Sequence, residues 1–145
     1  MKPIFTTLFL LLIASEILAQ NKEYSVHIHC SHIRNHKGTI RLGFFKTEED
    51  FEKEKPFKRM AISKESMTQK DLDATINVPE GTYGISALDD ENDNVKMDYT
   101  LIGIPKEGFA LSNHYHAGFS KPKLAQFLIV VNKSNMTINL KMRYF

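Results

Sequence analysis

The chain has 145 residues, of which 42% are hydrophobic and 25% charged, and its formal net charge is +2. A net charge this small argues against nucleic acid or an anionic membrane as an electrostatic partner. The only cysteine, Cys30, excludes an intramolecular disulfide, so packing must provide the stability.

The first residues have the pattern of a secretory signal peptide. A lysine at the start precedes an almost entirely apolar run over residues 4–13, and Ala19 lies at the expected cleavage point. Glu16 interrupts the apolar run before it reaches the roughly 20 residues of a membrane helix. We therefore expect a signal peptide at 1–19, a single domain at 20–145, export to the periplasm or the medium, and no membrane span after cleavage.

Two strands are predicted at the start of the mature chain. Residues 24–30 and 39–45 both alternate between apolar and polar side chains, and a turn at 35–38 separates them. The faces predicted to point inward carry Tyr24, Val26, Ile28, Cys30, Ile40, Leu42 and Phe44. Because the two segments are neighbours in the chain, we expect them to pair as a hairpin.

A short helical turn and five more strands follow. Thr47 and Asp50 have the spacing of a capping box, which predicts helix over 48–53. Strands are predicted at 58–62 as an edge strand, at 69–78, at 82–88 and 124–131 as central strands, and at 136–144. Their inward residues are Leu72, Ala74, Ile76, Val78, Tyr83, Ile85, Ala87, Met136, Ile138, Leu140, Met142 and Tyr144.

These elements predict an all-β fold, an antiparallel sandwich of seven strands with one long acidic loop. An up-and-down barrel is the alternative that the pattern favours less. Residues 89–122 do not fit the strand pattern, although residues 99–102 are a candidate extra strand. Because a long segment without regular structure is usually functional, we expect the 89–122 loop to carry the function.

The start of this loop has half the pattern of a calcium site. Asp90, Asn92 and Asn94 alternate, and Asp98 follows four residues later, a spacing that suits a hard cation such as Ca²⁺. The loop lacks the glycine and the bidentate glutamate of an EF-hand, and no helices flank it. The alternative is a polar loop of turns in which these side chains bond to their own backbone.

Histidines and one serine are the other candidates for chemistry. His27 and His29 share the outward face of a strand, and His114 and His116 share a face if their segment is extended, a spacing that suits Zn²⁺ or Cu²⁺. No carboxylate or thiolate stands at a fixed spacing from either pair, so surface polar residues are the competing interpretation. Ser112 lies near His114, but adjacency in sequence does not make a catalytic triad.

Several motifs together resemble an uncharacterised bacterial family, domain of unknown function 2141. They are Gly81-Thr82-Tyr83, the acidic run Asp90 to Asp98, Leu101 to Gly108 with Phe109 and Ser112-Asn113, the opening Ile33 to Phe45, and Leu140 with Arg143-Tyr144. The resemblance implies an exported single domain with an immunoglobulin-like or transthyretin-like sandwich, and it implies no activity. This chain has Asp89 where the family usually has His, and Val95 where the family usually has Gly. The first difference makes the loop more acidic, and the second removes an easy positive-φ turn.

Three functions follow from these patterns. We favour a non-enzymatic binding or accessory module of the cell envelope, whose unknown protein partner or ligand contacts the 89–122 loop. This interpretation predicts an exposed aromatic patch near Phe109, Tyr115 and Phe119. The alternatives are a calcium-stabilised structural domain and a metal-dependent enzyme that uses the surface histidines.

Overall fold

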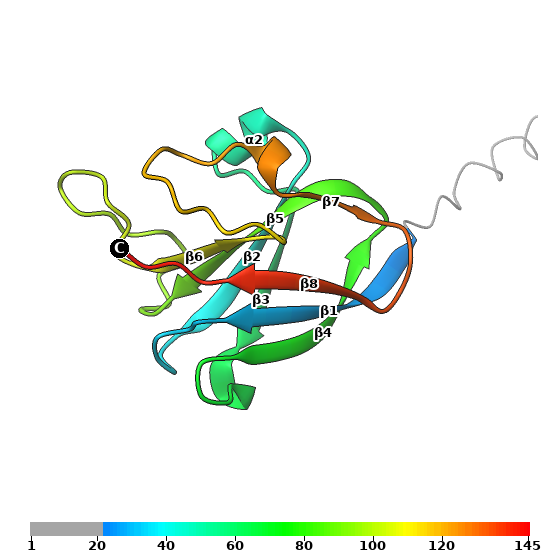
Figure 1. Ribbon diagram of the computed structural model, residues 1–145, viewed down its shortest axis with the longest axis horizontal. Helices are drawn as coiled ribbons and strands as arrows, with labels where there is room; N and C mark the ends of the chain where they lie inside the picture. Colours follow the sequence, from blue (N-terminus) through cyan, green and yellow to red (C-terminus); the bar gives the residue numbers. More distant parts are fainter. Residues whose placement is uncertain (1–21) are drawn as a thin grey trace, which may run out of the picture.

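The computed structural model describes residues 22–145, so the signal peptide predicted at 1–19 lies outside the described residues. Within this range eight strands form two sheets, and the prediction of an all-β fold is confirmed (Figure 1). Sheet A has the order β4-β1-β8, and sheet B has the order β3-β2-β5-β6 with β7 beside β5. The strands are β1 (Glu23–Ser31), β2 (Thr39–Phe45), β3 (Lys58–Ser63), β4 (Leu72–Pro79), β5 (Gly81–Asp90), β6 (Gly108–Leu111), β7 (Leu128–Val131) and β8 (Met136–Lys141).

The eighth strand lies within the segment predicted as a loop. β6 pairs antiparallel with β5, Leu88 opposite Phe109, whereas residues 99–102 form no strand and only Tyr99 bridges to Pro105. The sheets are also not wholly antiparallel, because β8 runs parallel to β1. The immunoglobulin-like or transthyretin-like type of the fold stays a prediction.

The expected hairpin between the first two strands is wrong. β1 pairs with β4 and β8 in sheet A, while β2 pairs with β3 and β5 in sheet B. The connection passes from one sheet to the other through Gly38, whose φ is +69° and where an added Cβ would lie 1.9 Å from the carbonyl oxygen of Asp90. Alternation places an apolar face toward the core, but it does not identify the neighbouring strand.

The core lies between the two sheets and contains most of the residues predicted to face inward. Val26, Ile28 and Cys30 of sheet A and Ile40 and Phe44 of sheet B have no exposed surface. Burial raises the pKa of the Cys30 thiol to about 12, as expected for a cysteine that packs as a small apolar residue.

A second, smaller cluster covers one end of the outer face of sheet B. It consists of Phe45, Phe51, Leu111, Leu124 and Phe127. Phe51 comes from the helix α2 (Glu48–Glu52), which the Thr47 hydroxyl caps by accepting the N–H of Asp50 at 3.1 Å, as predicted. Within residues 22–145 no helix is long and apolar enough to cross a membrane.

The prediction of a central strand over 124–131 is wrong. Residues Leu124–Gln126 form the short 3₁₀ helix η2, and only Leu128–Val131 form β7, which pairs with β5 alone. Leu124 and Phe127 are apolar because they belong to the second cluster, and β7 itself alternates between exposed and buried residues. The predicted edge position of β3 is confirmed.

Candidate functional site

The first two acids of the predicted loop belong to β5 and are fully buried. The Asp89 carboxylate contacts the Lys64 ammonium and accepts the Tyr144 hydroxyl, and Lys64 also donates to the carbonyl oxygen of Lys37 at 2.6 Å. Lys64 is itself 1% exposed. The expectation that Asp89 makes the loop more acidic is therefore wrong, because a buried cation compensates its charge.

Asp90 holds the beginning of the acidic loop. Its carboxylate accepts from the Arg41 guanidinium and from the backbone N–H groups of Asn94 and Val95, both at 3.0 Å. Arg41 also contacts the exposed Asp93 at 3.3 Å. By binding a cation and two backbone donors, this buried carboxylate fixes the backbone of the turn at residues 94 and 95.

The remaining predicted calcium ligands bond mainly to one another. Asp98 accepts the side-chain amides of Asn92 and Asn94, both at 2.8 Å, and these donors hold the pKa of Asp98 below its usual value. The Asn92 oxygen accepts the N–H of Asn94 at 3.1 Å, as in an Asx turn. Beneath them Glu107 accepts the N–H groups of Glu91 and Asp98, and its burial raises its pKa.

These contacts have the form that the turn-only alternative predicts. Each of the four side chains, Asp90, Asn92, Asn94 and Asp98, already accepts a hydrogen bond from the protein. Within residues 22–145 no group of three or more His, Cys, Asp or Glu side chains is arranged to hold a metal ion. Calcium binding at these four residues stays a prediction, and a cation there would compete with the existing hydrogen bonds.

The histidine pairs lie in separate places. His27 and His29 on β1 both contact Asp73 of β4, at 3.0 and 2.8 Å, and the bond from His29 is the main cause of the lowered Asp73 pKa. Sequence spacing missed this carboxylate because it comes from the paired strand, where Asp73 lies opposite His29. His114 and His116 have ring centroids 6.2 Å apart.

Ser112 has a structural role. It is 1% exposed, its hydroxyl donates to the carbonyl oxygen of Phe127 at 2.6 Å, and it accepts the N–H of Ile85 at 3.0 Å. These bonds join the loop after β6 to β5 and to the segment before β7. They leave the hydroxyl buried and fully engaged.

A groove of about 640 Å³ lies on the outer face of sheet B, and we call it the sheet-B groove. Its floor is the face of β2 and β5 that points away from the core. Gly43 lies opposite Ser86 in the middle of this floor, and the Phe45 ring packs over Gly43. Leu88 and Phe109 continue the floor toward β6.

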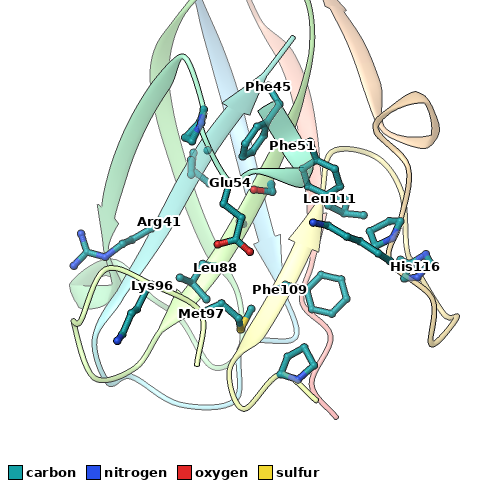
Figure 2. Close-up of a pocket in the computed structure, with 18 of the residues that line it drawn as sticks. Arg41, Phe45, Phe51, Glu54, Leu88, Lys96, Met97, Phe109, Leu111 and His116 are labelled. Carbon is teal, nitrogen blue, oxygen red and sulfur yellow. The ribbon is translucent and has the colours of Figure 1, made fainter. Parts of the chain in front are cut away.

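The walls are mainly apolar and come from α2 and from the 89–122 segment. The residues that line the groove include Phe45, Phe51, Glu54, Arg59, Ser86, Leu88, Val95, Lys96, Met97, Tyr99, Gly103, Pro105, Phe109, Phe119, Lys121 and Phe145. Figure 2 shows the Glu54 carboxylate pointing into the groove, with Phe45 and Phe51 on one side and Leu88 and Met97 on the other. Residues 89–122 thus form one wall of a cavity.

Cations outnumber carboxylates around this apolar surface. Arg59, Lys96 and Lys121 line the groove, and no carboxylate of residues 22–145 lies within ion-pair distance of them. Lys121 instead donates to the carbonyl oxygen of Glu52 at 3.0 Å. Glu54 is the only lining carboxylate among the described residues.

The expected aromatic patch is present only in part. Phe119 is 92% exposed and packs against Phe145, with ring centroids 6.1 Å apart, and Phe109 also stacks on Phe145 at the same separation. Tyr115 is exposed but lies apart from them, under the Lys141 ammonium. The patch therefore contains Phe145, which sequence reasoning missed, and lacks Tyr115.

Comparison with known proteins gives one match. A family model described as "Uncharacterized protein conserved in bacteria (DUF2141)" matches residues 28–139, most of the described chain. No curated protein and no solved structure matches the chain. Any proposal about function must therefore rest on the site itself.

Proposed function

The chain belongs to DUF2141, a family of uncharacterised proteins conserved in bacteria, and on that premise we propose that it is a non-enzymatic binding module of the cell envelope. It holds a small amphipathic anion, such as an acyl or aryl carboxylate, in the sheet-B groove. The observation that carries the proposal is an apolar cavity of about 640 Å³ bordered by three cations that have no carboxylate within ion-pair distance among residues 22–145.

The size and lining of the groove favour a small ligand. Sites for small molecules usually enclose about 300–1,000 Å³ and combine apolar walls with a few polar groups. Aromatic side chains at Phe45, Phe51 and Phe109 provide the apolar surface. An apolar tail is buried there without displacing any hydrogen bond between β2 and β5, because the groove contacts the side chains of the sheet.

The charges favour an anionic head group. Arg59, Lys96 and Lys121 line the groove together with a single carboxylate, that of Glu54, which accepts the Tyr99 hydroxyl at 3.5 Å. A cation on the ligand would meet three like charges, whereas an anion can approach any of them. This local excess of positive charge exists although the net charge of the whole chain is only +2.

Displacement of an anionic fluorescent amphiphile, anilinonaphthalene sulfonate, by dodecanoate tests the proposal. The Ser86→Leu substitution fills the floor of the groove, and we expect it to weaken both ligands at least tenfold, equivalent to about 1.4 kcal/mol. Thr82→Leu is the matched control, because Thr82 is an exposed residue of the same strand outside the groove lining. Equal binding by the two variants, or no binding by the native protein at millimolar dodecanoate, contradicts the proposal.

The preference for an anion has its own test. We expect the double substitution Arg59→Gln and Lys96→Gln to weaken dodecanoate about tenfold and to leave dodecanol unchanged. Lys70→Gln, at an exposed lysine outside the groove, is the control. If the affinities for dodecanol and dodecanoate fall together, the groove binds apolar molecules without regard to charge.

A further inference from the structure

The two most exposed aliphatic side chains of the described chain, Leu101 and Ile102, lie at the tip of one loop, and Ile104 follows them. Leu101 has a relative exposure of 107%, Ile102 of 81% and Ile104 of 38%. Figure 1 shows this yellow-green loop projecting from the body, away from the end where the grey trace joins. Large apolar groups gathered in solvent usually mark an interaction surface.

The backbone holds this tip in one shape. The N–H of Thr100 donates to the carbonyl oxygen of Ile104 at 2.8 Å, and the N–H of Gly103 donates back to that of Thr100 at 3.0 Å. Gly103 has φ +79°, a conformation that glycine adopts without strain. Below the tip, Tyr99 bridges to Pro105, so a short ladder supports the exposed residues.

We propose that the tip Leu101–Ile104 inserts into the head-group region of a phospholipid bilayer and docks the protein there. A stable protein interface buries about 800 Å² on each partner, which a narrow convex tip with three aliphatic side chains cannot supply. Insertion by about 5–10 Å, as in other interfacial anchors, requires only such a tip. The driving force is apolar burial, consistent with a net charge of only +2.

The residues around the tip suit this depth. Lys96 and Lys106 flank the tip in sequence and are exposed to solvent, and Tyr99 is a half-exposed aromatic at its base. Phe119 and Phe145 line the same groove as Gly103 and Pro105, so they provide a second apolar contact on the same side. Bilayer docking needs no ligand in the groove, and it does not rest on the proposed function.

Sedimentation with vesicles of phosphatidylcholine and phosphatidylglycerol tests the docking. We expect the native protein to sediment with the vesicles, and the double substitution Leu101→Asp and Ile102→Asp to weaken binding at least tenfold. Val130→Asp is the matched control, because Val130 is 56% exposed on β7, well away from the loop (Figure 1). An unchanged melting temperature in each variant shows that the fold is retained.

A fluorescence measurement makes the test specific to depth. The chain contains no tryptophan, so a Leu101→Trp variant carries a single reporter at the tip. We expect its emission to shift to shorter wavelength when vesicles are added, and that of a Val130→Trp variant to remain unchanged. Native protein that stays in solution, equal loss of binding in the tip and control variants, or no shift at the tip would overturn the proposal. Sedimentation without vesicles, which indicates self-association through the tip, would overturn it as well. The groove-filling Ser86→Leu variant should bind vesicles as the native protein does. Vesicle docking can therefore be distinguished from dodecanoate binding in the sheet-B groove.

Discussion

The first part of the 89–122 segment, residues 89–98, and the part that follows it differ in the environment of their side chains. In residues 89–98 the acids and amides bond to one another, to Arg41 and to the buried Lys64. In residues 99–122 the aliphatic tip and Phe119 extend into solvent. The acids and amides with the unusual charge pattern stabilise the fold, whereas the aliphatic side chains Leu101 and Ile102 are largely exposed.

This difference changes where function is sought. A cluster of acids suggests a cation site, but such a cluster is equally suited to closing a turn over a buried lysine and an arginine. An exposed apolar tip on an ordered turn has no such internal role. The comparison therefore predicts that substitutions among the mutually bonded acids and amides of residues 89–98 change stability, and that substitutions at the exposed tip Leu101–Ile104 change binding.

The largest effect is expected at Lys64. A Lys64→Met substitution leaves the Asp89 carboxylate buried beside the Tyr144 hydroxyl without its cation. Removing one partner of a buried ion pair usually costs about 3–5 kcal/mol of unfolding free energy. Urea denaturation measures the loss, and Lys70→Met at an exposed position serves as the control, with a change below about 0.5 kcal/mol. A loss as small at Lys64 as at Lys70 would mean that the buried charges do not support this end of the sandwich.

The next largest effect concerns two carboxylates that contact the same guanidinium, whose contributions to the unfolding free energy should differ. Asp90 is fully buried and also accepts two backbone N–H groups, whereas the Asp93 side chain is 54% exposed. We expect Asp90→Ala to lower the unfolding free energy by about 2–3 kcal/mol, because hydrogen bonds to charged groups are the stronger ones. Asp93→Ala should cost less than about 1 kcal/mol, as exposed pairs do. Similar losses in the two variants would refute the view that burial of Asp90 holds the loop.

The core residues could be predicted from the sequence, whereas the strand pairing and the buried ion pair could not. Alternation placed Ile28, Leu42 and Ile85 in the core, because burial on one face leaves a local period of two. The pairing partners of β1 were not predictable, since the same apolar face fits a hairpin or a contact across the core. Lys64 and Asp89 lie far apart in the chain, and each looks like a surface residue until the fold joins them.

The sequence indicates the sheet-B groove and the exposed tip to different degrees. Gly43 and Ser86 are small residues on the outward faces of their strands, and their position opposite each other is known only once β2 and β5 are paired. The exposure of Leu101 could not be predicted, because an apolar residue in a long loop is usually buried. The turn-only interpretation of Asn92 and Asn94 was available, since Asx turns depend on local spacing.

A smaller effect is expected in the pH dependence of stability. Burial raises the pKa of Glu107, so its contribution is fully present below the unfolded pKa and is lost as the pH rises through the folded value. Arg34 lowers the pKa of Glu91, whose contribution is present above the unfolded pKa and is lost as the pH falls. Between pH 4 and 7, stability relative to the native protein should increase with pH for Glu107→Gln and decrease for Glu91→Gln. Urea denaturation at several pH values measures both slopes, and slopes of the same sign would contradict the assignment.

Val95→Gly should stabilise the protein slightly. Val95 has φ +69°, which costs a β-branched residue about 1–2 kcal/mol, while glycine loses about 0.5–1 kcal/mol through its unfolded-state freedom. The net gain in unfolding free energy is therefore about 1 kcal/mol or less, seen as a small rise in melting temperature. Val130→Gly, in a regular strand, should lower it. A lower melting temperature for both variants would show that the turn at residue 95 is not strained.

The smallest effect is expected from calcium, and it decides between the two interpretations of the acidic loop. A cation at Asp98 would approach a carboxylate that already accepts the side-chain amides of Asn92 and Asn94, and at Asp90 it would meet the Arg41 guanidinium. We therefore expect millimolar Ca²⁺, compared with a chelator, to leave the melting temperature unchanged. Binding to the folded state alone would raise it, since stability increases with ligand concentration above the dissociation constant. A rise that disappears in Asp98→Asn but persists in Asp73→Asn, an exposed aspartate on the other sheet, would establish the calcium site and show that these bonds yield to a cation.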